Sequence, residues 1–210
     1  PIANAITVNT LEDVVADDGL CSLHEAILTA NTNVDSGGSE NECEGLGFPN
    51  TIDTILLPAG RLVLSQALPV ITEVTEIYGR SASQTVIDAS GGFFRTLTFN
   101  LAAVFDPENQ ICNIADLSIE GARSTGALFN QNCPKLNIVR ARFANNLVGA
   151  LVVVRGQELN VINTSFENNQ SSVAGAAILI LDKTFAFISR STFSNNYSAG
   201  NGGAINITGL

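Results

Sequence analysis

STFSNNYSAGNGGAINI, residues 191–207, is the third copy of a pattern that recurs along the second half of the chain. The earlier copies are FENNQSSVAGAAI at 166–178 and FANNLVGAL at 143–151. Each copy has a Phe, an Asn pair and a Gly or Ala segment before an apolar run. The Phe residues at 143, 166 and 193 are separated by 23 and 27 residues (166 − 143 and 193 − 166). A period of this length is typical of a solenoid.

The residues before each Phe predict short strands. In each coil, apolar or small residues stand seven, five and two residues before the Phe, and at the Phe position itself; we call these positions minus 7, minus 5, minus 2 and zero. In an earlier coil, Ile119 takes the place of the Phe. The residues at these positions are Cys112, Ile114, Leu117 and Ile119; Leu136, Ile138, Ala141 and Phe143; Leu159, Val161, Thr164 and Phe166; and Ala186, Ile188, Ser191 and Phe193. Within each coil, the first two inward residues are two positions apart, and so are the last two, with a change of phase between the pairs. This pattern indicates two short strands joined by a bend. A third strand follows at 150–154, 177–181 and 204–207. We predict an all-β fold, a single-stranded parallel β-helix.

Stacked coils would align the repeated residues in columns. We predict an aromatic column inside the core and an Asn column at the turn, hydrogen-bonded from coil to coil. The predicted members are Phe143, Phe166 and Phe193 for the first column, and Asn145, Asn168 and Asn195 for the second. Glycines at 149, 175 and 202–203 allow the tight turn into the third strand.

The segment CSLHEAILTAN, residues 21–31, predicts a short helix. Ser22 and Glu25 have the spacing of a capping box, and Leu23, Ala26, Ile27 and Ala30 share one face. We predict that this helix covers the first coil, with residues 1–50 as an N-terminal cap and 51–210 as coils continuous with it in one domain. His24 is the only histidine and is interpreted as structural, because the sequence lacks the context of a triad or a His-based metal site.

The four cysteines are interpreted as two disulfides. Cys112 and Cys133 stand near equivalent positions of neighbouring coils, so stacking brings them together. Cys21 and Cys43 would then join the cap helix to the acidic loop at 33–45. Free buried thiols are the alternative. Disulfides favour an exported protein.

Composition excludes several kinds of partner. The net charge is −10, with 14% charged and 45% hydrophobic residues, which argues against nucleic acid. No apolar run of about 18 residues is present, so we predict no membrane insertion by this segment. No cofactor or metal site is predicted, with calcium at the N-terminal acidic residues as the alternative. These residues are Asp13, Asp17, Asp18, Glu40, Glu42 and Glu44.

Two motifs resemble known families. The FxxN and GGAI signatures, as in 193–196 and 202–205, resemble the repeats of chlamydial polymorphic outer-membrane proteins, which are surface-exposed passengers. CSLHEAILTAN, the preceding ITVNTLEDVVADDGLC and the later SASQTVIDASG at 81–91 resemble secreted bacterial proteins with a CSLREA domain. That resemblance implies a right-handed β-helix. His24 stands where the CSLREA motif has Arg, so no role of that Arg is transferred.

The outward positions bear on catalysis, because a glycosidase needs two carboxylates and a lyase needs a base with charge neutralisation. Two outward columns are formed by the residues three positions and one position before the Phe position of each coil, and together they contain one carboxylate. They read Asp116, Arg140, Asn163 and Arg190, then Ser118, Arg142, Ser165 and Thr192. We interpret Asp116 beside Arg140 and Arg142 as an ion pair between coils, and we expect no stacked acidic cluster on this face. The sequence therefore predicts no hydrolase or lyase activity.

The combined prediction is a secreted or surface-displayed bacterial protein with a structural or adhesive role, as a surface passenger, matrix component or filament component. Its partners would be other extracellular proteins or glycans. Because the sequence stops at INITGL in the pattern of an inner coil, we also expect end-to-end self-association. The alternative is a carbohydrate-active enzyme, a polysaccharide lyase or hydrolase, or a glycan-binding module.

Overall fold

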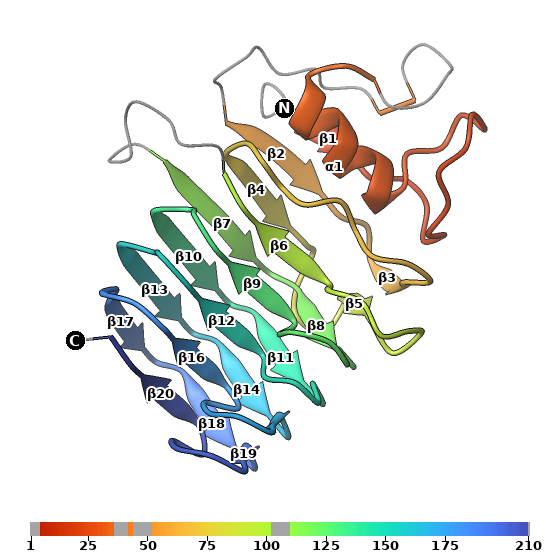
Figure 1. The fold of residues 1–210 in the computed structure, drawn as a ribbon. Helices are drawn as coiled ribbons and strands as arrows, with labels where there is room; N and C mark the ends of the chain where they lie inside the picture. The colour runs from red at the N-terminus through yellow and green to blue at the C-terminus, as the bar shows by residue number, and fades with distance from the viewer. Residues whose placement is uncertain (1–4, 36–41, 44–51, 102–109, 210) are drawn as a thin grey trace.

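Successive turns of the chain stack as the coils of a solenoid, with α1 at one end and β17, β18 and β20 at the other (Figure 1). The computed structural model describes residues 5–35, 42–43, 52–101 and 110–209. All strand pairings among these residues are parallel. The predicted all-β parallel β-helix with one short helix is confirmed.

Three long sheets form the sides of the solenoid. Sheet A contains β1 (Ala5–Thr7), β2 (Asp53–Leu56), β4 (Thr75–Tyr78), β7 (Ile111–Ala115), β10 (Lys135–Val139), β13 (Glu158–Ile162) and β17 (Phe185–Ser189). Sheet B contains β3 (Gly60–Val63), β5 (Thr85–Asp88), β8 (Ser118–Glu120), β11 (Arg142–Ala144), β14 (Ser165–Glu167) and β18 (Thr192–Ser194). Sheet C contains β6 (Leu97–Phe99), β9 (Leu128–Asn130), β12 (Leu151–Val153), β16 (Ile178–Ile180) and β20 (Ile205–Ile207). Among the described residues, β4 to β20 therefore make five complete coils, each with one strand per sheet.

The predicted register is confirmed throughout the second half. Leu136 pairs with Cys112 and Leu159 in sheet A, and Phe143 pairs with Ile119 and Phe166 in sheet B. The last two coils add a short pair, β15 (Gln170–Ser171) with β19 (Tyr197–Ser198), between the Asn pair and the Gly or Ala segment of the repeat.

The aromatic column lies inside the solenoid. The ring centroids of Phe143 and Phe166 are 5.1 Å apart with planes at 7°, and those of Phe166 and Phe193 are 5.0 Å apart with parallel planes. Phe143 and Phe166 are fully buried, whereas Phe193 in the last described coil is partly buried. The column therefore fills the core across three coils.

The Asn prediction is half right. Asn145, Asn168 and Asn195 do stand at a corner, with φ of 56°, 54° and 53°, a left-handed conformation that Asn tolerates. They are exposed, however, and they are not the residues that form the amide ladder. The left-handed corner turns the chain so that the second Asn of each pair points inward.

The buried amide ladder consists of Asn146, Asn169 and Asn196. Asn146 Nδ2 donates to Asn169 Oδ1 at 2.9 Å, and Asn169 Nδ2 donates to Asn196 Oδ1 at 2.9 Å. Asn169 Nδ2 also donates to the carbonyl oxygen of Phe143 at 3.0 Å, and Asn196 Nδ2 donates to that of Phe166 at 2.9 Å. Because Asn146 and Asn169 are fully buried, these bonds satisfy polar groups that water cannot reach.

The cap continues the solenoid at the N-terminal end. Helix α1 (Leu23–Thr32) buries the predicted apolar face and contacts β1 and β2. The strand β1 lies in the segment predicted as the cap, and it pairs with β2, the first strand of the predicted coils. Sheet A thus joins the cap to the coils.

Candidate functional site

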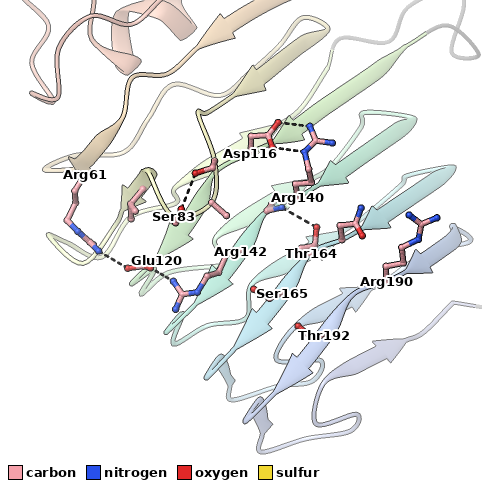
Figure 2. A pocket seen from close by; sticks show the side chains of 15 residues that line it. Arg61, Ser83, Asp116, Glu120, Arg140, Arg142, Thr164, Ser165, Arg190 and Thr192 are labelled. Carbon is pink, nitrogen blue, oxygen red and sulfur yellow. Dashed lines mark hydrogen bonds and ion pairs between the residues drawn. The ribbon is translucent and has the colours of Figure 1, made fainter.

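A groove with a volume of about 720 Å³ runs along the outer face of sheet B and the corner before it (Figure 2). We call it the sheet B groove. Its lining consists of Arg61, Ser81, Ala82, Ser83, Val86, Asp116, Glu120, Arg140, Ala141, Arg142, Asn163, Thr164, Ser165, Arg190 and Thr192. These residues come from successive coils, because parallel pairing places equivalent outward positions side by side.

The pleat of sheet B produces two outward columns, one residue before and one residue after the inward position. The first column reads Arg61, Val86, Ser118, Arg142, Ser165 and Thr192. The second reads Val63, Asp88, Glu120, Ala144, Glu167 and Ser194. Arginines in the first column therefore face carboxylates in the second.

These charges form a continuous alternating network. Arg61 contacts Asp88 at 2.7 Å and Glu120 at 3.1 Å, measured between nitrogen and oxygen. Arg142 also contacts Glu120, and it contacts Glu167 at 3.0 Å. The chain of pairs, Asp88 to Arg61 to Glu120 to Arg142 to Glu167, neutralises most of the charge at the N-terminal end of the groove.

A second ion pair occupies the corner between sheets A and B. Arg140 donates from Nε to Asp116 Oδ1 and from Nη2 to Asp116 Oδ2, both at 2.6 Å. Hydrogen bonding to Asp116 raises the pKa of Arg140 above its usual range. Burial alone would raise the pKa of Asp88, but hydrogen bonds from Ser90 and Arg61 lower it overall. The Asp88 carboxyl is consequently held ionised.

The prediction for this face is partly wrong. Asp116 pairs with Arg140 as expected, but Arg142 pairs with Glu120 and Glu167 instead. Stacked carboxylates are also present, since Asp88 and Glu120 are register partners in adjacent coils. The prediction rests on the two outward columns before the inward position only. Glu120 and Glu167 directly follow the inward residues Ile119 and Phe166. A residue at that place in a strand faces outward, so the sequence position alone could have identified both carboxylates.

The C-terminal end of the groove differs from its N-terminal end, which holds the ion pairs and which we call the paired end. Asn163, Ser165, Arg190 and Thr192 line it, and their side chains form no ion pair or hydrogen bond with the rest of the described chain. Figure 2 shows Arg190 beyond the linked pairs, with no interaction drawn to it. We call these four residues the open end of the groove. Their polar groups are available to a ligand.

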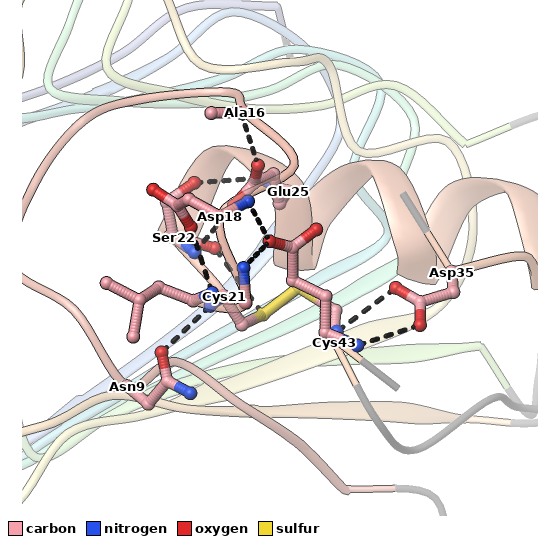
Figure 3. The surroundings of a disulfide bond; sticks show 11 residues. Asn9, Ala16, Asp18, Cys21, Ser22, Glu25, Asp35 and Cys43 are labelled. Atoms are coloured by element: carbon pink, nitrogen blue, oxygen red, sulfur yellow. Dashed lines mark hydrogen bonds between the residues drawn. A yellow bond between two sulfur atoms is a disulfide. The ribbon is translucent and has the colours of Figure 1, made fainter. Parts of the chain in front are cut away.

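The cap contains the first disulfide, between Cys21 and Cys43, as the sequence predicts (Figure 3). Asp35 accepts hydrogen bonds from the backbone N–H groups of Glu42 and Cys43 at 3.0 and 3.1 Å. Glu42 in turn accepts from the N–H groups of Asp18 and Gly19 at 3.0 and 2.7 Å. These carboxylates therefore hold the loops around the disulfide.

Backbone hydrogen bonds engage several of the acidic residues considered for calcium. Asp13 accepts from Ser65 N at 2.7 Å, Asp18 from Leu20 N at 2.9 Å and Glu42 from Asp18 N at 3.0 Å. Glu40 and Glu44 lie outside the described residues. Within the described ranges, no group of three or more His, Cys, Asp or Glu side chains could hold a metal ion. Calcium binding stays an untested alternative.

The capping box has both of its predicted bonds. Ser22 Oγ accepts from Glu25 N at 3.2 Å, and Glu25 Oε2 accepts from Ser22 N at 2.9 Å. The neighbouring His24 has its Nδ1 3.9 Å from Asp13 Oδ1, and the Asp13 carboxylate also accepts from Ser65 N at 2.7 Å. Ser22 and Glu25 thus act as structural residues that start α1.

The second disulfide joins Cys112 in β7 to Cys133, with Cα atoms 6.5 Å apart. Both residues are fully buried between neighbouring coils. All four cysteines are therefore paired as the sequence predicts.

Residues 163–180 and 190–208 match the family model of the Chlamydia polymorphic membrane protein repeat. The two segments contain β14 to β16 and β18 to β20, so each match covers the sheet B and sheet C sides of one coil. The chain is similar to this repeat there. The CSLHEA segment lies outside both matches. Searches of curated proteins and of solved structures gave no significant match. In the described part of the chain, no helix is long and apolar enough to cross a bilayer.

Proposed function

We propose that this protein is an extracellular, structural or adhesive β-helix displayed on a bacterial surface or secreted from it. The observation that carries the proposal is the match of two adjacent coils to a repeat of bacterial membrane surface proteins. The preceding coils have the same three-sheet register, so the matched architecture continues through the solenoid. The resemblance of the N-terminal segment to CSLREA proteins agrees with secretion.

The disulfides support an extracellular location. Such bonds persist in oxidising compartments and are rare in the reducing cytosol. Both bonds are between buried cysteines, one in the cap and one between coils. They would contribute to the stability of a protein that folds and acts outside the cell.

The groove supports a binding or structural role over catalysis. A glycosidase needs a carboxyl group that holds a proton beside a second, ionised carboxylate. Here Arg61 lies between Asp88 and Glu120 and pairs with both, and the pKa of Asp88 is lowered. We therefore expect incubation with acidic or neutral polysaccharides to yield neither new reducing ends nor unsaturated products. Turnover that is lost in Glu120→Gln would contradict a non-enzymatic role.

A labelling experiment tests the location. The chain has two lysines, and Lys183 is exposed. Intact cells that make the protein are treated with a membrane-impermeant amine reagent, and the Lys183 peptide is followed by mass spectrometry. We expect labelling of Lys183 in intact cells while a cytoplasmic control protein stays unlabelled. Labelling of Lys183 only after lysis would refute the proposal.

End-to-end association is a second part of the proposal. Within the described chain, β17, β18 and β20 have a strand neighbour on one side only. The core residues Ile188, Phe193 and Ile205 of this coil are partly buried rather than fully buried. A further coil, from the same chain or from a second copy, would cover them. Particles of the 210-residue chain that lengthen with concentration in light scattering and electron microscopy support association; monomers at every concentration contradict it.

A further inference from the structure

We infer that the open end of the sheet B groove binds an acidic polysaccharide, which it recognises through carboxylate groups on the sugars. The inference rests on the proposed extracellular location, where such polymers are encountered.

The charge of the groove is the first support. Four of the chain's ten basic residues line it, namely Arg61, Arg140, Arg142 and Arg190. The first three are paired with the carboxylates of Asp88, Asp116, Glu120 and Glu167, which leaves the positive charge of Arg190 at the open end uncompensated by an ion pair within the described chain. The whole chain carries a net charge of −10. A polyanion is repelled by most of such a surface, so the unpaired guanidinium of Arg190 directs it to the open end.

The pairing pattern then distinguishes one arginine from the other three. Arg61, Arg140 and Arg142 are held by carboxylates of the protein itself. Arg190 is exposed and has no ion-pair partner among the described residues. Its guanidinium can therefore contact an external carboxylate without first breaking an internal pair.

The neighbours of Arg190 suit a sugar. Asn163 occupies the same corner one coil earlier, and its backbone N–H donates to the carbonyl of Ser189 at 3.0 Å. Ser165 and Thr192 are register partners on the outer face of sheet B, about 4.8 Å apart along the solenoid axis. A guanidinium fork matches a carboxylate, while an amide and two hydroxyls can both donate to and accept from sugar hydroxyls.

The lining argues against other polyanions and against acidic proteins. Among the lining residues none is aromatic, and Val86 is the largest aliphatic one. Protein interfaces usually depend on buried aromatic or aliphatic anchors. Binding of single-stranded nucleic acid depends on aromatic stacking platforms. A hydrophilic, extended polyanion fits this lining best.

Two arginine variants make a matched test. Arg190→Asn removes the open guanidinium, and Asn163 shows that Asn suits this corner. Arg155→Asn is the control, since Arg155 is also exposed, has a φ of 60° against 51° for Arg190, and does not line the groove. Both variants lower the net charge by the same amount and place Asn at a left-handed position that it tolerates.

Binding is measured by isothermal titration calorimetry of the full chain with polygalacturonate, with dextran as the neutral probe, at low and high salt. We expect the wild type to bind polygalacturonate and not dextran. Arg190→Asn should weaken binding about tenfold, the value of one lost charge-assisted contact, whereas Arg155→Asn should change it less than about twofold. Ser165→Asp, which adds a carboxylate to the open end, should also weaken binding about tenfold or more and keeps the test valid if Arg190→Asn fails to fold.

The inference is overturned by lack of binding at low salt, by equal losses in the two arginine variants, by equal binding of dextran, or by tighter binding of single-stranded DNA. None of these outcomes bears on surface labelling of Lys183. Failure of the groove as a binding site and failure of the proposed location are thus distinguishable.

Discussion

The cap and the ladder coils stabilise buried backbone in different ways. In the ladder coils (residues 135–207), identical side chains stack, so Phe166 and Asn169 each contact an equivalent residue above and below. In the cap (residues 5–35 and 42–43), the stabilising side chains have no repeated equivalent. Glu42, for example, accepts hydrogen bonds from two backbone N–H groups beside the Cys21–Cys43 bond. We therefore expect a substitution in the ladder coils to destabilise several coils, whereas a substitution in the cap should destabilise the cap alone.

The largest effect is expected in the middle of the aromatic column. Phe166→Ala should lower the free energy of unfolding by about 3 to 5 kcal/mol, because it opens a cavity between two rings. Phe187→Ala is the control, since Phe187 is 58% exposed on the outer face of sheet A. Denaturant unfolding measures both. A loss below about 1 kcal/mol in Phe166→Ala would mean that the column contributes little.

Removal of the cap disulfide is the next largest change. The double variant Cys21→Ala/Cys43→Ala should lose about 3 kcal/mol, and hydrogen exchange should accelerate around Ala16 to Cys21 while the ladder coils keep their protection. The double variant Cys112→Ala/Cys133→Ala is a matched control, because the bonds span 22 and 21 residues. Equal loss of protection in the cap and the ladder coils after removal of the cap bond would remove the distinction between the two regions.

Neighbouring asparagines separate the buried ladder from the corner. Asn169→Ala should cost about 2 kcal/mol, because it leaves the amide of Asn146 and the carbonyl of Phe143 without bonds from that side chain. Asn168→Gly, at an exposed residue with φ of 54°, should change stability by less than about 0.5 kcal/mol. Thermal and denaturant unfolding compare the two. Equal costs would mean that the inward position is assigned to the wrong Asn.

A buried acid near the cap predicts a smaller, pH-dependent effect. Asp53 in β2 is fully buried and its carboxylate has no hydrogen-bond partner among the described residues. Burial first, and the charge of Glu73 second, raise its pKa from 3.8 to about 6. The folded state therefore keeps a proton that the unfolded chain has released, so this group destabilises the fold as pH rises from about 4 to about 6.

Asp53→Asn should remove that decline and gain about 1 to 2 kcal/mol at pH 7 relative to its effect at pH 4. Unfolding curves of both proteins across this pH range provide the measurement. Parallel pH profiles for the wild type and Asp53→Asn would show that Asp53 does not titrate in this range.

Much of the fold follows from sequence alone because inward positions repeat. Phe143, Phe166 and Phe193 fix the register, and once three coils are aligned, Cys112 and Cys133 fall close together. The second Asn was missed because sequence spacing does not reveal which residue of an Asn pair adopts the left-handed conformation. Only the positive φ at Asn168 shows that Asn169 turns inward.

The groove was less predictable, since its function depends on pairing between columns. Arg140, Arg142 and Arg190 look equivalent as outward arginines, yet Asp116, Glu120 and Glu167 engage only the first two. Long side chains reach across coils and columns, so sequence position alone does not determine their partners. The distinction between the paired end and the open end required side-chain geometry.

A non-reducing peptide map of the protein isolated from its native cells tests the central claim of an exported β-helix most directly. Free thiols are blocked at lysis, the chain is digested without reductant, and linked peptides are identified by mass spectrometry. The account predicts two linked pairs, Cys21 with Cys43 and Cys112 with Cys133, and no blocked cysteine. Four blocked cysteines would contradict both export and the disulfide-linked cap.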